Sequence, residues 1–192
     1  MNQRSAIIFD LDGTLTKPCL DFDAIRTATG IEGPILEALP DLDEDARRRA
    51  ERILERHEAD AARNAVLYEG AVEVVAACRR AGHPVAILTR NSRASLSTVL
   101  EGHGIVVDAA RTREDGAVKP SAEPILSICA ELKADPKQSW MIGDFLFDIM
   151  SGEAAGTHTV LMIADEPPPD FADRAEHVIR RLPELLALIG LA

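Results

Sequence analysis

The sequence has few cysteines and no long apolar run, and both absences narrow the class of protein. Its 192 residues include 3 cysteines, and Cys19, Cys78 and Cys129 lie far apart without a Cys-x-x-Cys pair. This spacing argues against a disulfide framework or a zinc site and favours reduced thiols in a cytoplasmic protein. No stretch approaches the roughly 20 apolar residues of a membrane-spanning helix, and the apolar run at residues 7–9 is too short for a signal peptide. We therefore expect no contact with a membrane.

Basic residues are also scarce. The chain has 21 Lys and Arg against 32 Asp and Glu, which gives a formal net charge of −11. The densest basic run, Arg47-Arg48-Arg49, stands among acids and is typical of a solvated helix face. A nucleic-acid-binding protein usually carries a basic surface, so nucleic acid is not an expected partner. The same acidity repels anionic substrates, so a phosphate site in this chain needs cations next to the phosphate.

The sequence does contain short apolar runs that alternate with helical patterns. Hydrophobic residues make up 46 % of the chain, which is enough for a core. Apolar runs predict buried strands at residues 6–9, 84–88, 105–107, 140–142 and 158–162. Helical patterns occupy residues 71–80, 92–103, 122–132, 146–155 and 182–189. The alternation indicates an α/β fold in which a parallel sheet carries helices on both faces.

One segment, from about residue 20 to residue 67, interrupts this alternation. It is strongly charged and is predicted to be helical. Residues 42–64 are expected to form one long helix, because Ala46, Ala50, Leu54 and His57 recur at helical spacing. The segment is therefore predicted to be a helical insert between the first strand and the first helix of the sheet.

Carboxylates follow two of the predicted strands. Asp10 and Asp12 come directly after the first strand, and Asp144 follows the fourth. Residues two apart in an extended strand face the same side, so the first two carboxylates repel each other unless a cation lies between them. The carboxyl ends of parallel strands meet at one edge of a sheet, where ligands bind, and hard oxygen ligands suit Mg²⁺. An Asp-x-Asp-Gly segment alone is as consistent with a turn or a helix cap, but the second acidic segment favours a metal site.

A hydroxyl and an ammonium follow the other two strands. Thr89 comes after the second strand and just before a predicted helix, where backbone N–H groups form an anion site. Lys119 follows the third strand and would offer a point charge to a phosphate. Taken singly, Thr89 is also consistent with a helix cap and Lys119 with a surface residue. Their positions beside the carboxylates favour a phosphate site.

In order and spacing, these segments resemble the four signature motifs of the haloacid dehalogenase (HAD) superfamily. Residues 10–14 (DLDGT) resemble its first motif, Thr89 its second, Lys119-Pro120 its third and residues 143–148 (GDFLFD) its fourth. The resemblance covers about residues 5–162 and implies a Rossmann-like parallel sheet of five strands with a small helical cap. Residues 1–17 and 68–192 are accordingly predicted to form the core domain, and residues 18–67 the cap.

The same resemblance implies a role for each site residue. Asp10 would attack phosphorus and form an aspartyl phosphate, while Asp12 would act as general acid and then as general base. Mg²⁺ would be held by the carboxylates of Asp10 and Asp144 and by the backbone carbonyl of Asp12. Asp148 would orient Lys119 or a metal-bound water. The expected substrate-binding residues are Leu11, Thr89, Arg90, Asn91 and Lys119.

The implied activity is hydrolysis of a small phosphorylated metabolite, such as phosphoglycolate or a sugar phosphate. Dehalogenating members of the family lack an aspartate at the position of Asp12, so its presence favours phosphoryl transfer. Two alternatives remain open, a phosphotransferase such as a sugar phosphomutase and a non-catalytic binding protein on the same fold. The short insert argues against a mutase, which must exclude water. The filled reactive positions argue against a binding protein.

The remaining expectations concern residues of the cap, Arg90 and the oligomeric state. Phe22, Ile25 and Arg26 are expected to line the entrance from the cap. Arg26 is a candidate for binding a substrate carboxylate, with a surface ion pair as the alternative. Arg90 stands where the family usually has a small or amide residue, and it either reaches toward the leaving group or the cap, or is a surface arginine. A monomer is the simpler expectation.

Overall fold

The computed structural model describes residues 4–164 and 167–191, and its centre is a parallel sheet. The strands pair in parallel in the spatial order β3-β2-β1-β4-β5-β6. This confirms the predicted α/β class. The strands are β1 (Ile7–Phe9), β2 (Val85–Leu88), β3 (Ala109–Arg111), β4 (Trp140–Gly143), β5 (His158–Met162) and β6 (His177–Ile179).

The expected strand number was wrong, because the described part of the chain forms a sheet of 6 strands and not 5. The additional strand is β6, which pairs with β5 through Val160 and His177. Its three residues, His177 to Ile179, include an exposed Val178. Such a short and half-polar edge strand does not stand out as an apolar run.

The third strand was also placed wrongly, at residues 105–107 in place of β3. Ile105 is buried, but its N–H donates to the Leu100 carbonyl at 2.9 Å. Gly104 precedes it in the left-handed conformation and ends the helix. Ile105 therefore belongs to the helix terminus, and the chain reaches the sheet only at Ala109.

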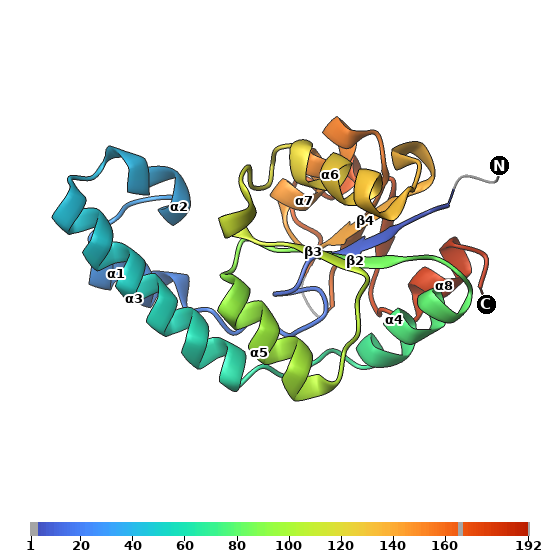
Figure 1. Cartoon of the computed structure of the whole chain (residues 1–192), viewed down its shortest axis with the longest axis horizontal. Helices are drawn as coiled ribbons and strands as arrows, with labels where there is room; N and C mark the ends of the chain where they lie inside the picture. Colours follow the sequence, from blue (N-terminus) through green and yellow to red (C-terminus); the bar gives the residue numbers. More distant parts are fainter. Residues whose placement is uncertain (1–3, 165–166, 192) are drawn as a thin grey trace.

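Side chains of the central strand β1 alternate between two buried layers, as the period of a strand requires. Ile7 and Phe9 pack with α4, α5 and α8, while Ile8 packs in the layer that includes α6. Figure 1 shows α4, α5 and α8 on one side of the sheet and α6 and α7 on the other. The helices are α4 (Ala71–Arg80), α5 (Arg93–His103), α6 (Glu123–Leu132), α7 (Leu146–Ala155) and α8 (Glu184–Leu188).

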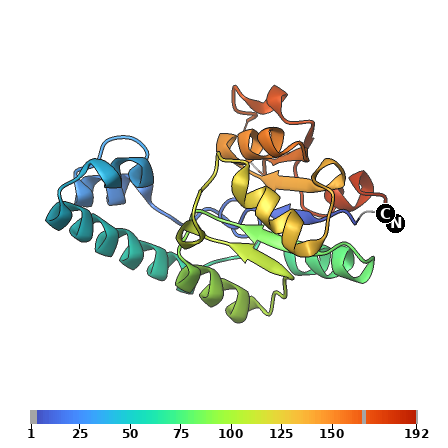
Figure 2. The same ribbon diagram turned by 45° about the horizontal axis from the view of Figure 1, so that its top comes forward.

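The insert is helical, as predicted, and projects from the sheet domain (Figures 1 and 2). It consists of α1 (Phe22–Thr29), α2 (Ile35–Ala38) and the long α3 (Glu44–Arg63). Asp43 caps α3 by accepting a hydrogen bond from Ala46 N–H at 2.8 Å. The insert has a buried cluster of its own, formed by Ile25, Ile31, Ile35, Ala50 and Leu54.

The two ends of the insert lie side by side on the core. Lys17 N–H donates to the Val66 carbonyl at 2.8 Å, and Tyr68 N–H donates to the Leu15 carbonyl at 2.9 Å. Beyond this junction α3 packs along α5. The chain thus leaves and rejoins the core close to the carboxyl end of β1. Among the described helices, none combines the length and apolar character needed to cross a membrane.

Candidate active site

The carboxyl ends of β1, β2 and β4 face a cavity of about 580 Å³ between the core and the cap. Side chains from α1, α2 and α3 form its outer wall. The predicted site residues that line it are Asp10, Asp12, Thr89, Arg90, Asn91, Lys119, Asp144 and Asp148. The exception is Leu11, whose side chain is buried in the core.

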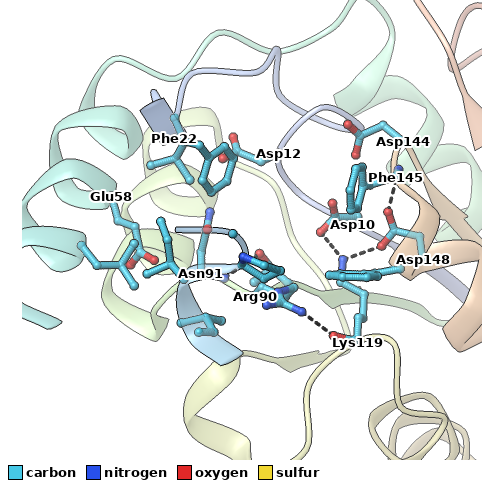
Figure 3. Close-up of a pocket in the computed structure, with 18 of the residues that line it drawn as sticks. Asp10, Asp12, Phe22, Glu58, Arg90, Asn91, Lys119, Asp144, Phe145 and Asp148 are labelled. Carbon is cyan, nitrogen blue, oxygen red and sulfur yellow. Dashed lines mark hydrogen bonds and ion pairs between the residues drawn. The ribbon is translucent and has the colours of Figure 1, made fainter. Parts of the chain in front are cut away.

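Lys119 lies between two aspartates at the inner end of the cavity (Figure 3). Its Nζ is 2.7 Å from Asp10 Oδ1 and 2.5 Å from Asp148 Oδ1. Asp148 Oδ2 accepts the Phe145 N–H at 3.0 Å, so both oxygens of Asp148 have donors. Burial alone would lower the pKa of Lys119, but the charges of Asp10 and Asp148 outweigh it and raise that pKa. Asp148 therefore holds a charged ammonium against Asp10.

Three carboxylates converge here, and a single ammonium does not balance them. Oxygens of Asp10, Asp144 and Asp148 lie within 4.8 Å of one another. Burial raises the pKa of Asp10 to about 7 despite Lys119. Burial, with the charges of Asp10 and Asp148, raises the pKa of Asp144 to about 8. This excess of buried negative charge fits a divalent cation with oxygen ligands, and Asp10 and Asp144 have the oxygens not already engaged by Lys119 or Phe145.

Asp12 turns its carboxylate away from this cluster. Its Oδ1 accepts hydrogen bonds from Thr16 Oγ1 at 3.0 Å and from Cys19 Sγ at 3.4 Å. Figure 3 shows the side chain on the same side of the cavity as Phe22. The two aspartates of the first motif therefore have different surroundings, one against Lys119 and the other facing the cap.

Two glycines allow the close approach of the aspartates. A Cβ on Gly13, which has φ of +81°, would lie 2.1 Å from Asp144 Oδ2. A Cβ on Gly143 would lie 2.2 Å from Cβ and Cγ of Asp148. The cluster requires glycine at both positions because a side chain would occupy the space of a carboxylate.

The loop after β2 supplies the predicted phosphate-binding groups. Thr89 is buried at the cavity, and its Oγ1 accepts the Asn91 N–H at 3.1 Å. Ser92 is the residue that caps α5, by accepting the Ser95 N–H at 3.3 Å. The residue that caps the N-terminus of α5 is thus Ser92 and not Thr89.

Arg90 joins the core to the cap. Its Nη2 donates to both carboxylate oxygens of Glu37 on α2 at 2.7 Å, and its Nη1 donates to the Lys119 carbonyl at 2.6 Å. The guanidinium also lies 5.0 Å from the centre of the Phe147 ring. Among the alternatives from the sequence, this agrees with an arginine that reaches toward the cap, because its partner Glu37 lies on α2.

The cap residues expected at the entrance have three different surroundings. Phe22 lines the cavity and is half exposed. Ile25 was predicted wrongly, since α1 turns this apolar side chain into the cap's own core, where it is fully buried. Arg26 lines the cavity and pairs with Asp23 at 2.7 Å, in agreement with the ion-pair alternative.

Sequence reasoning missed Glu58, Phe145 and Phe147, which all line the cavity. Glu58 on α3 is buried and accepts the Ser92 N–H at 3.2 Å and a hydrogen bond from the Arg113 guanidinium. A charged helix does not reveal which of its acids faces the core. The two phenylalanines lie inside the fourth motif, so their position next to Asp144 offered a clue.

The sheet, the carboxylate–lysine cluster and the cavity under a helical insert define a Rossmann-like hydrolase of the phosphatase type. The chain belongs to the haloacid dehalogenase-like hydrolase family, whose model matches residues 19–156. The predicted membership of the HAD superfamily is thereby confirmed.

Similar proteins and a similar solved structure agree with this assignment. An uncharacterized hydrolase of Saccharomyces cerevisiae is 32 % identical over 167 residues, covering 82 % of this chain and 76 % of the yeast protein. The N-acetylmuramic acid 6-phosphate phosphatase of Pseudomonas putida is 27 % identical over 180 residues, or 80 % of each chain. The crystal structure of a hydrolase from Pseudomonas syringae has a TM-score of 0.82 at 18 % identity and covers 97 % of this chain and 98 % of that one. This last likeness supports the fold.

Proposed function

We propose that the protein is a Mg²⁺-dependent hydrolase of small phosphomonoesters that works through an aspartyl phosphate on Asp10. The observation that carries this proposal is the position of Asp10, 2.7 Å from Lys119 Nζ and within the carboxylate cluster, at the inner end of the cavity. A nucleophile for phosphorus needs a cation beside it, because the carboxylate and the phosphate are both anionic.

The reaction would proceed in two steps. An Asp10 oxygen forms a bond to phosphorus as the bond to the leaving alcohol breaks, and Asp12 donates a proton to that alcohol. A water molecule then attacks phosphorus, Asp12 accepts its proton, and inorganic phosphate leaves with Asp10 restored. The Thr89 hydroxyl, the Lys119 ammonium and backbone N–H groups of Leu11 and Arg90 would hold the phosphoryl oxygens, with Asn91 beside them.

The carboxylates of Asp10 and Asp144, together with the Asp12 backbone carbonyl, would hold Mg²⁺. When bound, the ion supplies positive charge that neutralises the site as an anionic phosphate approaches. The buried excess of carboxylates supports this assignment. Asp148 would act indirectly, by keeping the Lys119 ammonium in place.

The proposed substrates are soluble phosphate esters of small organic alcohols, the broad class to which phosphoglycolate and the sugar phosphates belong. Relatives named phosphoglycolate phosphatase, from Rhodospirillum rubrum, and N-acetylmuramic acid 6-phosphate phosphatase support this range. The former is 25 % identical and covers 82 % of this chain. The cavity volume of about 580 Å³ lies within the usual range for small-molecule sites.

The proposal is tested by phosphate release from p-nitrophenyl phosphate. We expect turnover with Mg²⁺, loss of turnover with EDTA, and recovery when Mg²⁺ is added in excess. Asp10→Asn should abolish turnover and leave the circular dichroism spectrum unchanged, whereas Asp60→Asn, at an exposed position on α3, should retain full activity. Full activity in Asp10→Asn would exclude the covalent route, and binding of phosphate without turnover in the unmodified protein would indicate a non-catalytic protein.

A further inference from the structure

We propose that the leaving alcohol of the substrate carries a flat aromatic ring, which lies between Phe22 of the cap and Phe145 and Phe147 of the core. This inference rests on the proposed function for the chemistry at Asp10 and specifies which phosphomonoesters the site selects. The region bounded by these three rings is called the ring slot below.

The distribution of aromatic residues first points to the ring slot. The chain has only 5 Phe, 1 Trp and 1 Tyr, or 4 % aromatic residues. Phe22, Phe145 and Phe147 nevertheless line one cavity. In Figure 3, Phe22 and Phe145 lie on opposite sides of it, the first beside Asp12 and the second beside Asp144. In a chain with so few rings, this gathering matches the aromatic lining of a ligand site.

The Phe145 ring is held in place by its neighbours, and both Phe145 and Phe22 remain open to the cavity. Phe145 makes an edge contact with Phe147, at 5.2 Å between centres and 84°, and another with Phe171, at 6.1 Å and 76°. Its N–H is bound to Asp148 at 3.0 Å. Even so, Phe145 is 53 % exposed and Phe22 is 49 % exposed. An exposed ring on each side of the cavity is the arrangement that a stacked ligand ring needs.

The cations of the cavity wall favour a leaving group without a charge. Among the described lining residues, each Lys or Arg already has an acidic partner. Lys119 lies against Asp10 and Asp148, Arg90 is bound by Glu37, and Arg26 pairs with Asp23. A second anionic group on the substrate, such as the carboxylate of phosphoglycolate, would have to displace one of these acids.

Apart from Arg26 and Glu58, the rest of the outer wall is apolar, and the cavity is roomy. Besides Phe22, the cap contributes Leu20, Pro34, Ile35, Leu36 and Leu54 to the lining. A volume of about 580 Å³ exceeds what a phosphate with two or three further atoms fills, and cavities of this size usually bind ring-sized molecules. Burial of an aromatic ring against these side chains would stabilise the complex without a further polar partner.

The test compares 2-phenylethyl phosphate with n-butyl phosphate and 2-phosphoglycolate in the Mg²⁺-loaded protein. The first two esters release unactivated primary alcohols of similar acidity, so a difference in kcat/KM reports recognition and not leaving-group reactivity. We expect the ring ester to be preferred by about tenfold over either comparator, the order of effect of an aromatic contact and its buried area. Equal kcat/KM values, or a preference for phosphoglycolate, would overturn the proposal.

Substitutions at Phe22 and Phe145 test where the aromatic ring of the substrate binds. Phe22→Ala and Phe145→Ala should each reduce the preference for 2-phenylethyl over n-butyl phosphate by about fivefold, mainly through KM. Leu126→Ala, which removes an apolar side chain that is 43 % exposed on α6 outside the cavity, should leave the preference unchanged. A preference that persists in both phenylalanine variants would place the ring elsewhere and overturn the ring slot.

A binding measurement separates this proposal from the proposed function. If none of the esters is hydrolysed, the hydrolase assignment fails, and calorimetric titration with 2-phenylethylphosphonate and n-butylphosphonate in the presence of Mg²⁺ still tests the slot. Tighter binding of the ring compound, lost in Phe22→Ala, would support the slot alone. Equal affinities, or no binding of either compound, would overturn it.

Discussion

At the scale of single residues, Gly143 sets how closely β4 approaches Asp148. A Cβ there would meet Asp148 at 2.2 Å, so Gly143→Ala should displace the carboxylate that holds Lys119. Because a shift of about 1 Å in a catalytic group can cost about 100-fold, we expect a fall of about that size in kcat on p-nitrophenyl phosphate.

Gly102→Ala is the matched control for this prediction. Gly102 lies within α5, and a Cβ there would meet no atom within 4 Å. Alanine favours helix over glycine by about 1 kcal/mol, so this variant should be as stable as the parent or more so, with unchanged turnover. Unchanged turnover in Gly143→Ala, with its melting temperature retained, would show that Asp148 does not need its observed position.

At the scale of elements, Glu58 links the cap helix α3 to the start of α5 through a hydrogen bond. Its carboxylate binds the Ser92 N–H and the Arg113 guanidinium in a buried site. Glu58→Ala would leave the Ser92 N–H without its acceptor and Arg113 without its acidic partner, and breaking a buried charge pair costs about 3–5 kcal/mol. We expect a loss of about 3 kcal/mol in the free energy of unfolding, measured by urea titration.

Glu55→Ala on the same helix supplies the comparison, because Glu55 is exposed. Its substitution should change the unfolding free energy by less than about 0.5 kcal/mol. Similar values for the two variants would mean that the contact of α3 with α5 does not depend on the buried carboxylate.

Asp108 connects α4 to the sheet and makes stability depend on pH. Its carboxylate accepts hydrogen bonds from Arg79 Nη2 at 2.9 Å and Val85 N–H at 2.9 Å. The hydrogen bond from Arg79 holds the pKa of Asp108 below its ordinary value. The folded state therefore binds this proton less readily than the unfolded state, and the stabilisation is present above about pH 4 and is lost as pH falls through the folded pKa.

Asp108→Asn should accordingly destabilise the protein by about 1 kcal/mol at pH 7, and by progressively less as pH falls below about 4. Thermal melts of the variant and the parent across this pH range measure the difference. The gap between the two melting temperatures should narrow as pH falls below about 4, and a gap that stays constant would exclude the carboxylate charge as its cause.

The same elements show what the sequence could and could not reveal. The bounds of α4 and α7 agree with the predicted segments 71–80 and 146–155, because Gly82 and Gly156 follow their apolar patterns. β3 was misplaced because the apolar triplet at residues 105–107 serves the end of α5. Strand-end residues such as Asp10 and Asp144 could be predicted to meet, since parallel topology alone brings them together. The Arg90–Glu37 pair could not, because it depends on how the cap folds back over the core.

At the scale of the whole molecule, the net charge of −11 should make substrate capture sensitive to salt. A phosphomonoester dianion is repelled over distances of about a Debye length, which is about 10 Å at 0.1 M salt. We expect kcat/KM for p-nitrophenyl phosphate to rise about threefold between 10 and 150 mM KCl at saturating Mg²⁺, with kcat unchanged. A fall in kcat/KM would indicate that a locally positive field outweighs the total charge.

The two outermost strands of the sheet, β3 and β6, are 3 residues long each. An edge strand exposes unpaired N–H and C=O groups that another chain can extend, and nature blunts this hazard with short, charged edges. β3 also ends in Arg111, which is paired with Glu131 at 2.6 Å. A second copy would therefore find little backbone on which to add a strand. The sheet is protected at both margins against amyloid-like growth, and concentrated solutions of the folded protein should stay free of strand-mediated aggregates.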